Sequence, residues 1–534
     1  MKQFFSILLM LSIIAASLAG CTVTEVNEET TVEILSEAPT EAPTEAPTEA
    51  PTEAPTETTR DSATASDTTA EAPATTTPEE ATTTAPEEEE EPLPDPIPCT
   101  LNGTSLADFT IIYPHTGPDY NKNAANYLSE EIAKRTGNVL PVKSDRDQAE
   151  TLSHEIVVGE TNRTISETLD ADTAALQFSM LADDAHVAME GDYFVIAAAA
   201  YYFVETYIET ESFDAVIAKE ESVHDPIVKE AKNFIFLIGD GMGFNQTKLF
   251  EAFNATTLGM YSDKESAFYG YMLPYAGSSR TDSLSGTTDS AAGGTALATG
   301  YKTKNGYVGK DGNLNDVKSL TEIAIELGKS TAIMSTEELT GATPAAFSAH
   351  TSSRNNTADI RAAQRALTDA HGTPFLGNYG SYYSEGSIRF RMERHITETL
   401  ETLSQNENGF FFMFEEGYID KHSHSNDLEK TFLAAVRFNQ AIGCFMEFAF
   451  YHPETALIIT ADHETGGLTV GEDGTFSYTS DSHTSADVPV FAYGCGMDIF
   501  NGVAVENIQI PKTIAKMWGY DLVGYDNENF PALN

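Results

Sequence analysis

The segment Asn233-Phe-Ile-Phe-Leu-Ile-Gly-Asp-Gly-Met-Gly243 joins a continuous apolar run to a glycine-rich end that carries one aspartate. A run that is apolar on both faces is typical of a strand buried inside a parallel sheet. The alternation of such runs with helix-like segments predicts a three-layer α/β/α fold with a mostly parallel sheet over residues 232–534. The further runs are Ser330 to Met334, Phe410 to Phe414, Ala456 to Thr460 and Val488 to Ala492.

Acidic side chains follow four of these five runs within a few residues. Ligands of open α/β sheets bind beyond the carboxyl ends of the strands, so the carboxylates indicate a metal site at that edge. The first glycine-rich turn does not fit a dinucleotide-binding loop, because Phe244 stands where the third glycine of that motif belongs. The acidic residues are Asp240, Glu337 and Glu338, Glu415 and Glu416, and Asp462.

Histidines strengthen the indication of metal binding. Asp420 and His424 are four residues apart, a spacing that places both side chains on one face of a helical turn. Asp462 and His463 are adjacent, directly after an apolar strand, where both can turn toward one pocket. Taken alone, His483 is more typical of an ordinary loop histidine.

The segment from Gly286 to Gly300 carries a candidate nucleophile, Ser290. The small residues after Ser290 predict a closely packed helix whose N-terminal amides face an anion. From this segment alone, Ser290 is interpreted as the N-cap of that helix.

Together these motifs resemble the alkaline phosphatase family, in the family's order, over roughly Asn233 to Gly494. Several matches in order are far more specific than any one of them. The matching pieces are Gly239 to Gly243, Thr288 to Ala291, Thr340 to Ala345 with Ala349 to Arg354, Glu415 to His424, Thr460 to Gly467, and Ser482 to Thr484.

The resemblance implies two zinc ions and a magnesium ion. The implied zinc ligands are Asp420, His424 and His483 for one ion, and Asp240, Asp462 and His463 for the other, which lies beside Ser290. The implied magnesium ligands are Asp240 again, Thr343 and Glu415, with Glu416 as the second choice for the glutamate. The family usually has an aspartate or histidine where this chain has Gly341, so we expect the third metal to bind more weakly or differently.

The resemblance also implies a reaction, the hydrolysis of phosphate monoesters through a phosphoserine at Ser290. Zinc lowers the pKa of a bound hydroxyl, which makes serine a nucleophile at mild pH. Arg354 offers a planar fork to two phosphoryl oxygens, Asp289 would orient that arginine, and Lys421 would add charge near the phosphate through water.

Two other functions remain open. A phosphodiesterase of the same superfamily is the nearest competitor, although Arg354 favours monoesters because they carry more charge to clamp. A non-catalytic surface protein that retains a phosphatase fold is the alternative from another class. A sulfatase does not fit, because Ser290 is followed by alanines and glycines and not by the Pro-x-Arg setting.

The N-terminal part predicts export and anchoring. Residues 1–21 read as a lipoprotein signal peptide that ends Leu18-Ala-Gly-Cys21, so we expect a lipid anchor on Cys21 at the outer face of a bacterial cell membrane. Residues 22–98 form an acidic stalk with Glu-Ala-Pro-Thr repeats that cannot build a core. Residues 99–228 predict a small α/β accessory domain of unknown partner, with apolar runs at Phe109 to Tyr113, Glu155 to Val158 and Tyr193 to Ala197 and a helix from Asn123 to Arg135.

Charge and cysteine content add two further expectations. The formal net charge of -52 disfavours nucleic acid as a partner. Cys444 and Cys495 are either a disulfide or two buried thiols. A homodimer is compatible with the family resemblance.

Overall fold

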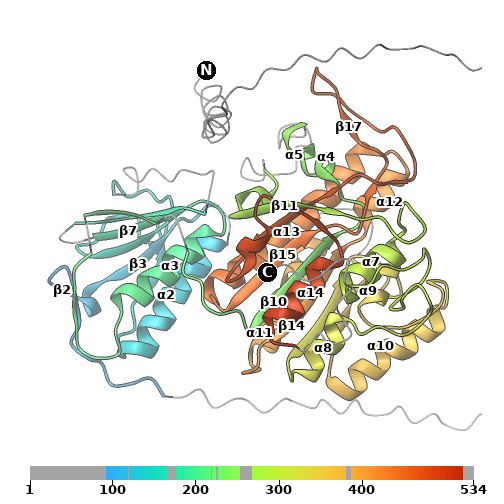
Figure 1. Cartoon of the computed structure of the whole chain (residues 1–534). Helices are drawn as coiled ribbons and strands as arrows, with labels where there is room; N and C mark the ends of the chain where they lie inside the picture. The colour runs from blue at the N-terminus through green and yellow to red at the C-terminus, as the bar shows by residue number, and fades with distance from the viewer. Residues whose placement is uncertain are drawn as a thin grey trace, which may run out of the picture. The chain divides into compact units, whose positions relative to one another are not determined.

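The structure is a computed structural model that describes residues 92–520 apart from 118, 166–175, 184–185, 218, 224–225, 253–266 and 380–386. The described residues belong to one compact unit. Two sheets dominate this unit, a six-stranded sheet and an eight-stranded sheet (Figure 1).

The eight-stranded sheet has the order β13-β12-β14-β10-β15-β20-β11-β21. All neighbours in it are parallel except β20, which is antiparallel to both β15 and β11. The expected α/β fold with a mostly parallel sheet is therefore confirmed, and each of the five apolar runs forms a strand. The strands are β10 (Asn233–Gly239), β11 (Tyr275–Arg280), β12 (Ser330–Ser335), β13 (Phe375–Leu376), β14 (Phe410–Glu416), β15 (Thr455–Thr460), β20 (Val488–Tyr493) and β21 (Ala504–Glu506).

Two hydrophobic cores lie on the two faces of this sheet, because successive side chains of a strand point to opposite faces. Along β10, Phe234, Phe236 and Ile238 belong to one core, and Ile235 and Leu237 belong to the other. The first core also contains side chains of α7, α8, α9, α10 and α14, and the second contains side chains of α11 and α13. The sheet is thus the middle layer between two layers of helices.

The helices of this part begin and end at typical signals. Helix α7, for instance, ends at Gly300, which has the left-handed φ of 76° that favours glycine. The helices are α4 (Phe244–Thr247), α5 (Leu249–Ala252), α7 (Ser290–Thr299), α8 (Leu320–Glu326), α9 (Ala342–Ala346), α10 (Thr357–His371), α11 (Ser387–Ser404), α12 (Tyr418–His424), α13 (Leu428–Tyr451) and α14 (Gln509–Met517). Two short antiparallel two-stranded sheets lie outside the large sheet, formed by β16 (Glu464–Thr465) with β19 (His483–Thr484) and by β17 (Thr469–Val470) with β18 (Phe476–Ser477).

The N-terminal sheet has the order β4-β3-β5-β7-β6-β9 and is accompanied by two helices. The expected helix is present as α2 (Tyr120–Thr136) and stops at Gly137, as the sequence indicates. The run Tyr193 to Ala197 leads into a helix, α3 (Val195–Tyr207). The strands are β3 (Thr110–Tyr113), β4 (Val142–Ser144), β5 (Glu155–Val158), β6 (Phe178–Ala182), β7 (His186–Gly191) and β9 (Glu220–Val223), beside a small sheet of β1 (Thr100–Leu101), β2 (Thr104–Ser105) and β8 (Asp214–Ala215).

Side chains from α2 attach the N-terminal sheet to α13. The rings of Tyr127 and Tyr451 lie 4.4 Å apart between centroids, and Asn123 donates a 2.9 Å hydrogen bond to Glu447. The predicted boundary between an accessory domain and a catalytic domain remains a prediction, because these contacts join the two sheets in one compact unit.

Cys99, Cys444 and Cys495 are all free thiols, so the disulfide considered for Cys444 and Cys495 is not formed. The signal peptide, the lipid anchor on Cys21 and most of the acidic stalk lie outside the described residues. Within the described part of the chain, none of the helices is long and apolar enough to span a bilayer.

The turn after β10 depends on Gly241. Its φ of 75° is left-handed, and a Cβ at this position would lie 2.7 Å from the Cα of Asp420 and 2.8 Å from its Cβ. The absence of a side chain at residue 241 therefore allows α12 to approach the end of β10.

We predict that Gly241→Ala lowers the free energy of unfolding by about 3 kcal/mol, because it adds a steric overlap with Asp420 to the strain of a left-handed alanine. Gly372→Ala is the matched control, since Gly372 has a φ of 68° and nothing within 4 Å of its Cβ position. The control should lose about 1 kcal/mol. Urea unfolding measures both values, and equal losses would contradict the role given to the close approach.

Candidate metal centre and nucleophile

The carboxyl ends of β14, β10 and β15 lie side by side in the sheet, and each is followed by acidic residues. Asp240 follows β10, Glu415 and Glu416 end β14, and Asp462 follows β15. These carboxylates are at most 4% exposed. Because the buried groups share one edge of the sheet, they require positive partners there.

A first cluster joins Asp420 and His424 of α12 to His483 of β19. The two Nε2 atoms of His424 and His483 lie 3.0 Å apart, and Asp420 Oδ1 lies 3.3 Å from the first and 3.5 Å from the second. Ligand atoms around a tetrahedral zinc ion, at bond lengths of about 2.0–2.2 Å, lie about 3.3–3.6 Å apart. The spacing of the three atoms thus suits one face of such a tetrahedron.

The outer ring nitrogens fix the tautomers of both histidines. Nδ1 of His424 contacts the carbonyl oxygen of Asp481 at 2.6 Å, and Nδ1 of His483 contacts the carbonyl oxygen of Thr288 at 2.8 Å. A carbonyl oxygen only accepts, so both Nδ1 atoms carry hydrogen, and in the neutral form of each ring Nε2 holds the lone pair. Two such lone pairs that face each other repel unless a proton or a metal cation lies between them.

A second cluster surrounds Nε2 of the fully buried His463. Ser290 Oγ lies 3.2 Å from this nitrogen, Asp462 Oδ2 lies 3.3 Å from it and Asp240 Oδ1 lies 3.4 Å from it. Asp240 Oδ1 and Asp462 Oδ2 are buried and have no hydrogen-bond partner. Each of these oxygens lies at a ligand-to-ligand distance from the imidazole nitrogen that suits a shared zinc ion, and the serine oxygen is one of them.

Thr465 links the two clusters, a role that the sequence motifs did not assign. Its hydroxyl donates to Asp420 Oδ1 at 2.5 Å and lies 3.2 Å from Nδ1 of His463. Because that hydroxyl proton is given to Asp420, the threonine oxygen accepts from Nδ1, which leaves the Nε2 lone pair of His463 free to face Ser290. Asp420 also lies close enough to Asp240 and His463 to share a cation with them.

Ser290 is the first residue of α7 and is 4% exposed. The helix cap is Asp289, whose carboxylate accepts from the backbone N–H of Ala292 at 3.0 Å. The interpretation of Ser290 as the N-cap is therefore wrong. Residue 289 has the extended backbone that a cap requires, and the serine hydroxyl remains available at the helix N-terminus.

Asp289 also holds Arg354, as the family resemblance implies. Nη1 of Arg354 lies 3.2 Å from Asp289 Oδ2, and the backbone N–H of Gly306 donates to both carboxylate oxygens of Asp289. The side chain of Arg354 is 37% exposed, so the guanidinium is accessible to a ligand from solvent.

A third cluster consists of Asp240, Glu337 and Glu415. The hydroxyl of Thr343 and Oε1 of Glu415 are buried without a hydrogen-bond partner. Glu416, the second choice for the glutamate, binds Arg437 and accepts from Thr336, so it is not available. Sequence reasoning counted Glu337 among the acidic residues at this edge of the sheet but did not name it as a metal ligand.

Lys421 has a partner that was not expected. Its ammonium pairs with Oε2 of Glu337, and its Nζ lies 5.0 Å from the ring centroid of Tyr418. Burial lowers the pKa of Lys421. The ion pair places this lysine beside the third cluster.

The buried carboxyls and imidazoles differ in the direction of their pKa shifts. Burial raises the pKa of Glu415 to about 8, and burial together with Asp420 raises the pKa of Asp462 to about 7. Burial and the Asp462 carboxylate raise the pKa of Asp240 well above its usual range. Burial opposes the ionisation of Asp420, but its hydrogen bond with His483 and the nearby His463 lower its pKa to about 2. Burial and His483 lower the pKa of His463 to about 3, so that imidazole is neutral.

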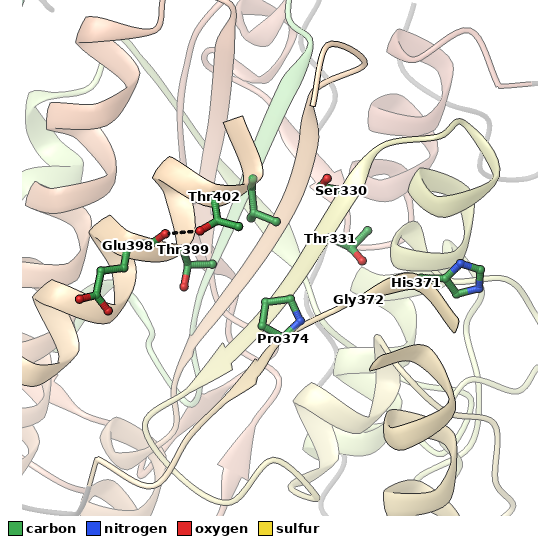
Figure 2. A pocket seen from close by; sticks show the side chains of 9 residues that line it. Ser330, Thr331, His371, Gly372, Pro374, Glu398, Thr399 and Thr402 are labelled. Atoms are coloured by element: carbon green, nitrogen blue, oxygen red, sulfur yellow. Dashed lines mark hydrogen bonds between the residues drawn. The ribbon is translucent and has the colours of Figure 1, made fainter. Parts of the chain in front are cut away.

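Two hollows open at the surface of the described part. One of about 340 Å³ lies at the opposite end of β12, among residues such as Ser330, His371 and Glu398, and contains none of the clustered ligands (Figure 2). The other, of about 370 Å³, is lined by Glu464 and Thr484, the neighbours of His463 and His483. The second hollow therefore borders the metal clusters.

Known proteins resemble this chain over the same region. The sequence profile described as alkaline phosphatase matches residues 231–375 and 391–479. Alkaline phosphatase 4 of Bacillus subtilis is 30% identical over 306 residues, which cover 48% of this chain and 66% of the relative, slightly under two thirds. The alkaline phosphatase of Escherichia coli is 24% identical, with 53% of this chain and 84% of the relative covered. Among solved structures, the alkaline phosphatase from the Antarctic bacterium TAB5 is 26% identical and covers 55% of this chain and 99% of its own, with a TM-score of 0.47.

The profile match contains the strand ends that carry Asp240, Glu415 and Asp462, together with Ser290 at the start of α7. This agreement between matched sequence and clustered side chains identifies the family: the chain belongs to the alkaline phosphatase family.

Proposed function

We propose that the protein is a metal-dependent phosphomonoester hydrolase with Ser290 as its nucleophile, two zinc ions and one magnesium ion. The observation that carries the proposal is the convergence of three oxygens on one imidazole nitrogen: Ser290 Oγ, Asp462 Oδ2 and Asp240 Oδ1 each lie within 3.4 Å of Nε2 of His463. Mixed imidazole and carboxylate donors at tetrahedral spacing are typical zinc ligands.

The donor sets fit the expected metals. Asp420, His424 and His483 would hold one zinc ion, and Asp240, Asp462 and His463 would hold the other. Bound zinc supplies Lewis-acid chemistry, since it lowers the pKa of a nearby hydroxyl and stabilises developing charge on an oxygen. The third cluster offers only oxygen donors, which suits magnesium.

The residues of the chain prepare Ser290 for attack. Asp289 caps α7, so the serine hydroxyl lies at the helix N-terminus, where the backbone dipoles favour an anionic phosphate. Arg354, held by Asp289, presents its guanidinium to two phosphoryl oxygens of a monoester. Burial of Ser290 limits competition from bulk water.

The proposed reaction has two in-line steps. Ser290 Oγ attacks phosphorus while the bond from phosphorus to the alcohol oxygen breaks, which yields a phosphoserine and the alcohol. Water then attacks phosphorus and releases Ser290 and inorganic phosphate. Each step inverts the configuration at phosphorus, so the two steps together retain it.

The expected surroundings of the enzyme belong to the same proposal. A lipid anchor on Cys21, an acidic stalk and an extracytoplasmic location remain predictions from the sequence, as does a homodimer. They would place the phosphatase outside the cell on a tether.

We predict that Ser290→Ala lowers kcat for an aryl phosphate by about 10³-fold or more, because the nucleophile is lost, while both zinc ions remain bound. Steady-state kinetics and metal analysis of the same sample measure the two effects. Thr299→Ala on the same helix is the control, since its hydroxyl donates only to the carbonyl of Thr295. Zinc loss in Ser290→Ala would indicate a structural serine.

We predict that Arg354→Ala raises KM for a phosphate monoester about tenfold or more and changes KM for a matched diester much less, because a diester carries less charge for the guanidinium to bind. Arg361→Ala, at an exposed position on α10, is the control. The ratio of kcat/KM for the two substrates is the measurement. An unchanged ratio would argue against a phosphate-binding role and favour the diesterase alternative.

We predict that the chelator-treated protein loses stability as pH rises from about 5 to about 8. Glu415 and Asp462 have pKa values of about 8 and about 7 in the folded state, above their ordinary values. The folded state therefore binds more protons than the unfolded state in this window, and stability falls until both carboxyls ionise. Cations replace those protons, so the metal-loaded protein should lack this decline. Thermal unfolding at several pH values tests both forms, and a chelated protein that gains stability over this range would refute the assignment.

A further inference from the structure

We propose that Glu337 is a direct ligand of the third cation, that its carboxylate fills the volume beside Gly341, and that Lys421 holds it in place. This inference rests on the proposed function for the zinc sites and adds a ligand that neither the motifs nor the family resemblance assigns. It also answers the expectation that Gly341 weakens the third metal site.

The first support is a cluster of buried oxygens. One carboxylate oxygen from each of Asp240, Glu337 and Glu415 lies within 4.8 Å of the other two, and the three residues are 4%, 9% and 0% exposed. Glu415 Oε1 and Thr343 Oγ1 have no hydrogen-bond partner. Buried oxygens without donors are costly, and a cation among them offsets that cost.

The second support is a space between two glycines that the Glu337 side chain occupies. A Cβ on Gly341 would lie 2.9 Å from Glu337 Oε1 and 2.9 Å from the carbonyl oxygen of Glu338, and a Cβ on Gly417 would lie 2.8 Å from Cγ and 2.9 Å from Cδ of Glu337. Any other residue at 341 or 417 would therefore overlap with the glutamate. The φ of Gly341 is -54°, so its backbone conformation does not require glycine, and the close approach of Glu337 Oε1 and of the Glu338 carbonyl oxygen explains the residue.

The third support is that the two carboxylate oxygens of Glu337 make different contacts. Oε2 pairs with the ammonium of Lys421, and Oε1 is the oxygen beside Gly341. The ion pair fixes the rotamer of a long side chain, which an aspartate would not need. Three carboxylates and one ammonium also leave a net charge of -2, which matches a divalent cation.

The donor chemistry selects the type of cation. Carboxylate and hydroxyl oxygens are hard ligands that favour magnesium over zinc, and magnesium keeps several water molecules when few protein oxygens are supplied. No imidazole belongs to the third cluster among the described residues. The cation is therefore hydrated magnesium.

A competing interpretation is that Glu337 only neutralises Lys421. Glu337→Gln would then weaken magnesium binding indirectly, through the unpaired ammonium, and Glu337→Gln with Lys421→Gln would restore it. If Glu337 is a ligand, the double variant stays as weak as Glu337→Gln, because the missing oxygen is not replaced.

The experiment is a calorimetric titration of magnesium chloride into protein loaded with two equivalents of zinc. We expect Glu337→Gln, alone or with Lys421→Gln, to bind magnesium about tenfold more weakly or worse, since even outer contacts of metal ligands carry effects of that size. Glu338→Gln is the matched control, because Glu338 is the adjacent, exposed glutamate. Wild-type affinity in Glu337→Gln, or its recovery in the double variant, overturns the proposal.

A second variant tests the proposal even if Glu337→Gln does not fold. Gly341→Ala retains every ligand but places a methyl group 2.9 Å from both Glu337 Oε1 and the carbonyl oxygen of Glu338, so it should displace the Glu337 carboxylate and also weaken magnesium binding. Two bound zinc ions per chain show that the rest of the centre is intact. Unchanged magnesium affinity in Gly341→Ala would count against the position given to Glu337.

Turnover of an aryl phosphate by the wild-type protein separates this inference from the proposed function. A wild-type protein that binds magnesium through Glu337 but hydrolyses nothing would refute the function and leave the ligand assignment standing. A wild-type protein that hydrolyses the ester while Glu337→Gln binds magnesium normally would refute only the ligand.

Discussion

Repulsion among buried carboxylates at one edge of the sheet is the constraint on which the rest of the structure depends. Asp240, Glu415 and Asp462 are each at most 4% exposed and lie at the ends of neighbouring strands, and among the described residues none of them forms a salt bridge with a lysine or arginine. Their raised pKa values show that the protein alone prefers to protonate them. Such an arrangement costs stability unless cations bind, so the fold and the proposed chemistry cannot be separated.

Residues that contact the candidate ligands also orient them toward the metal clusters. Thr465, Asp481 and Thr288 set the tautomers of three histidines so that each Nε2 lone pair faces a cluster. Asp289 serves both as the cap of α7 and as the partner of Arg354. One carboxylate thus couples the direction of the helix to the position of the guanidinium, and the serine between them has little freedom to move.

Much of the architecture could be predicted because buried parallel strands are apolar on both faces. Runs such as Phe410 to Phe414 are therefore visible without a structure. Strand β11 was not visible, because Tyr275–Arg280 is polar and half-exposed at its place between β20 and β21. In the N-terminal sheet, β6 alternates buried and partly buried residues, a weaker pattern than a continuous run. The apolar run at Tyr193 did not distinguish a strand from a helix, since a short apolar segment suits a buried strand and a buried helix equally well.

The site likewise contains residues whose placement could be predicted from the sequence and others whose placement could not. The spacing of Asp420 and His424 predicts a shared face of a helix, and the structure places both side chains in one cluster. The partner of Lys421 could not be predicted, because Glu337 reaches it from a different strand end through a space left by two glycines. In evolutionary terms, a metal ligand can be replaced by one four positions away in the sequence, at residue 337 in place of residue 341, while the metal site itself stays in the same place. A homology search that demands an acid or imidazole at column 341 would discard such sequences as degenerate, although their loss at one position is matched by a gain at another.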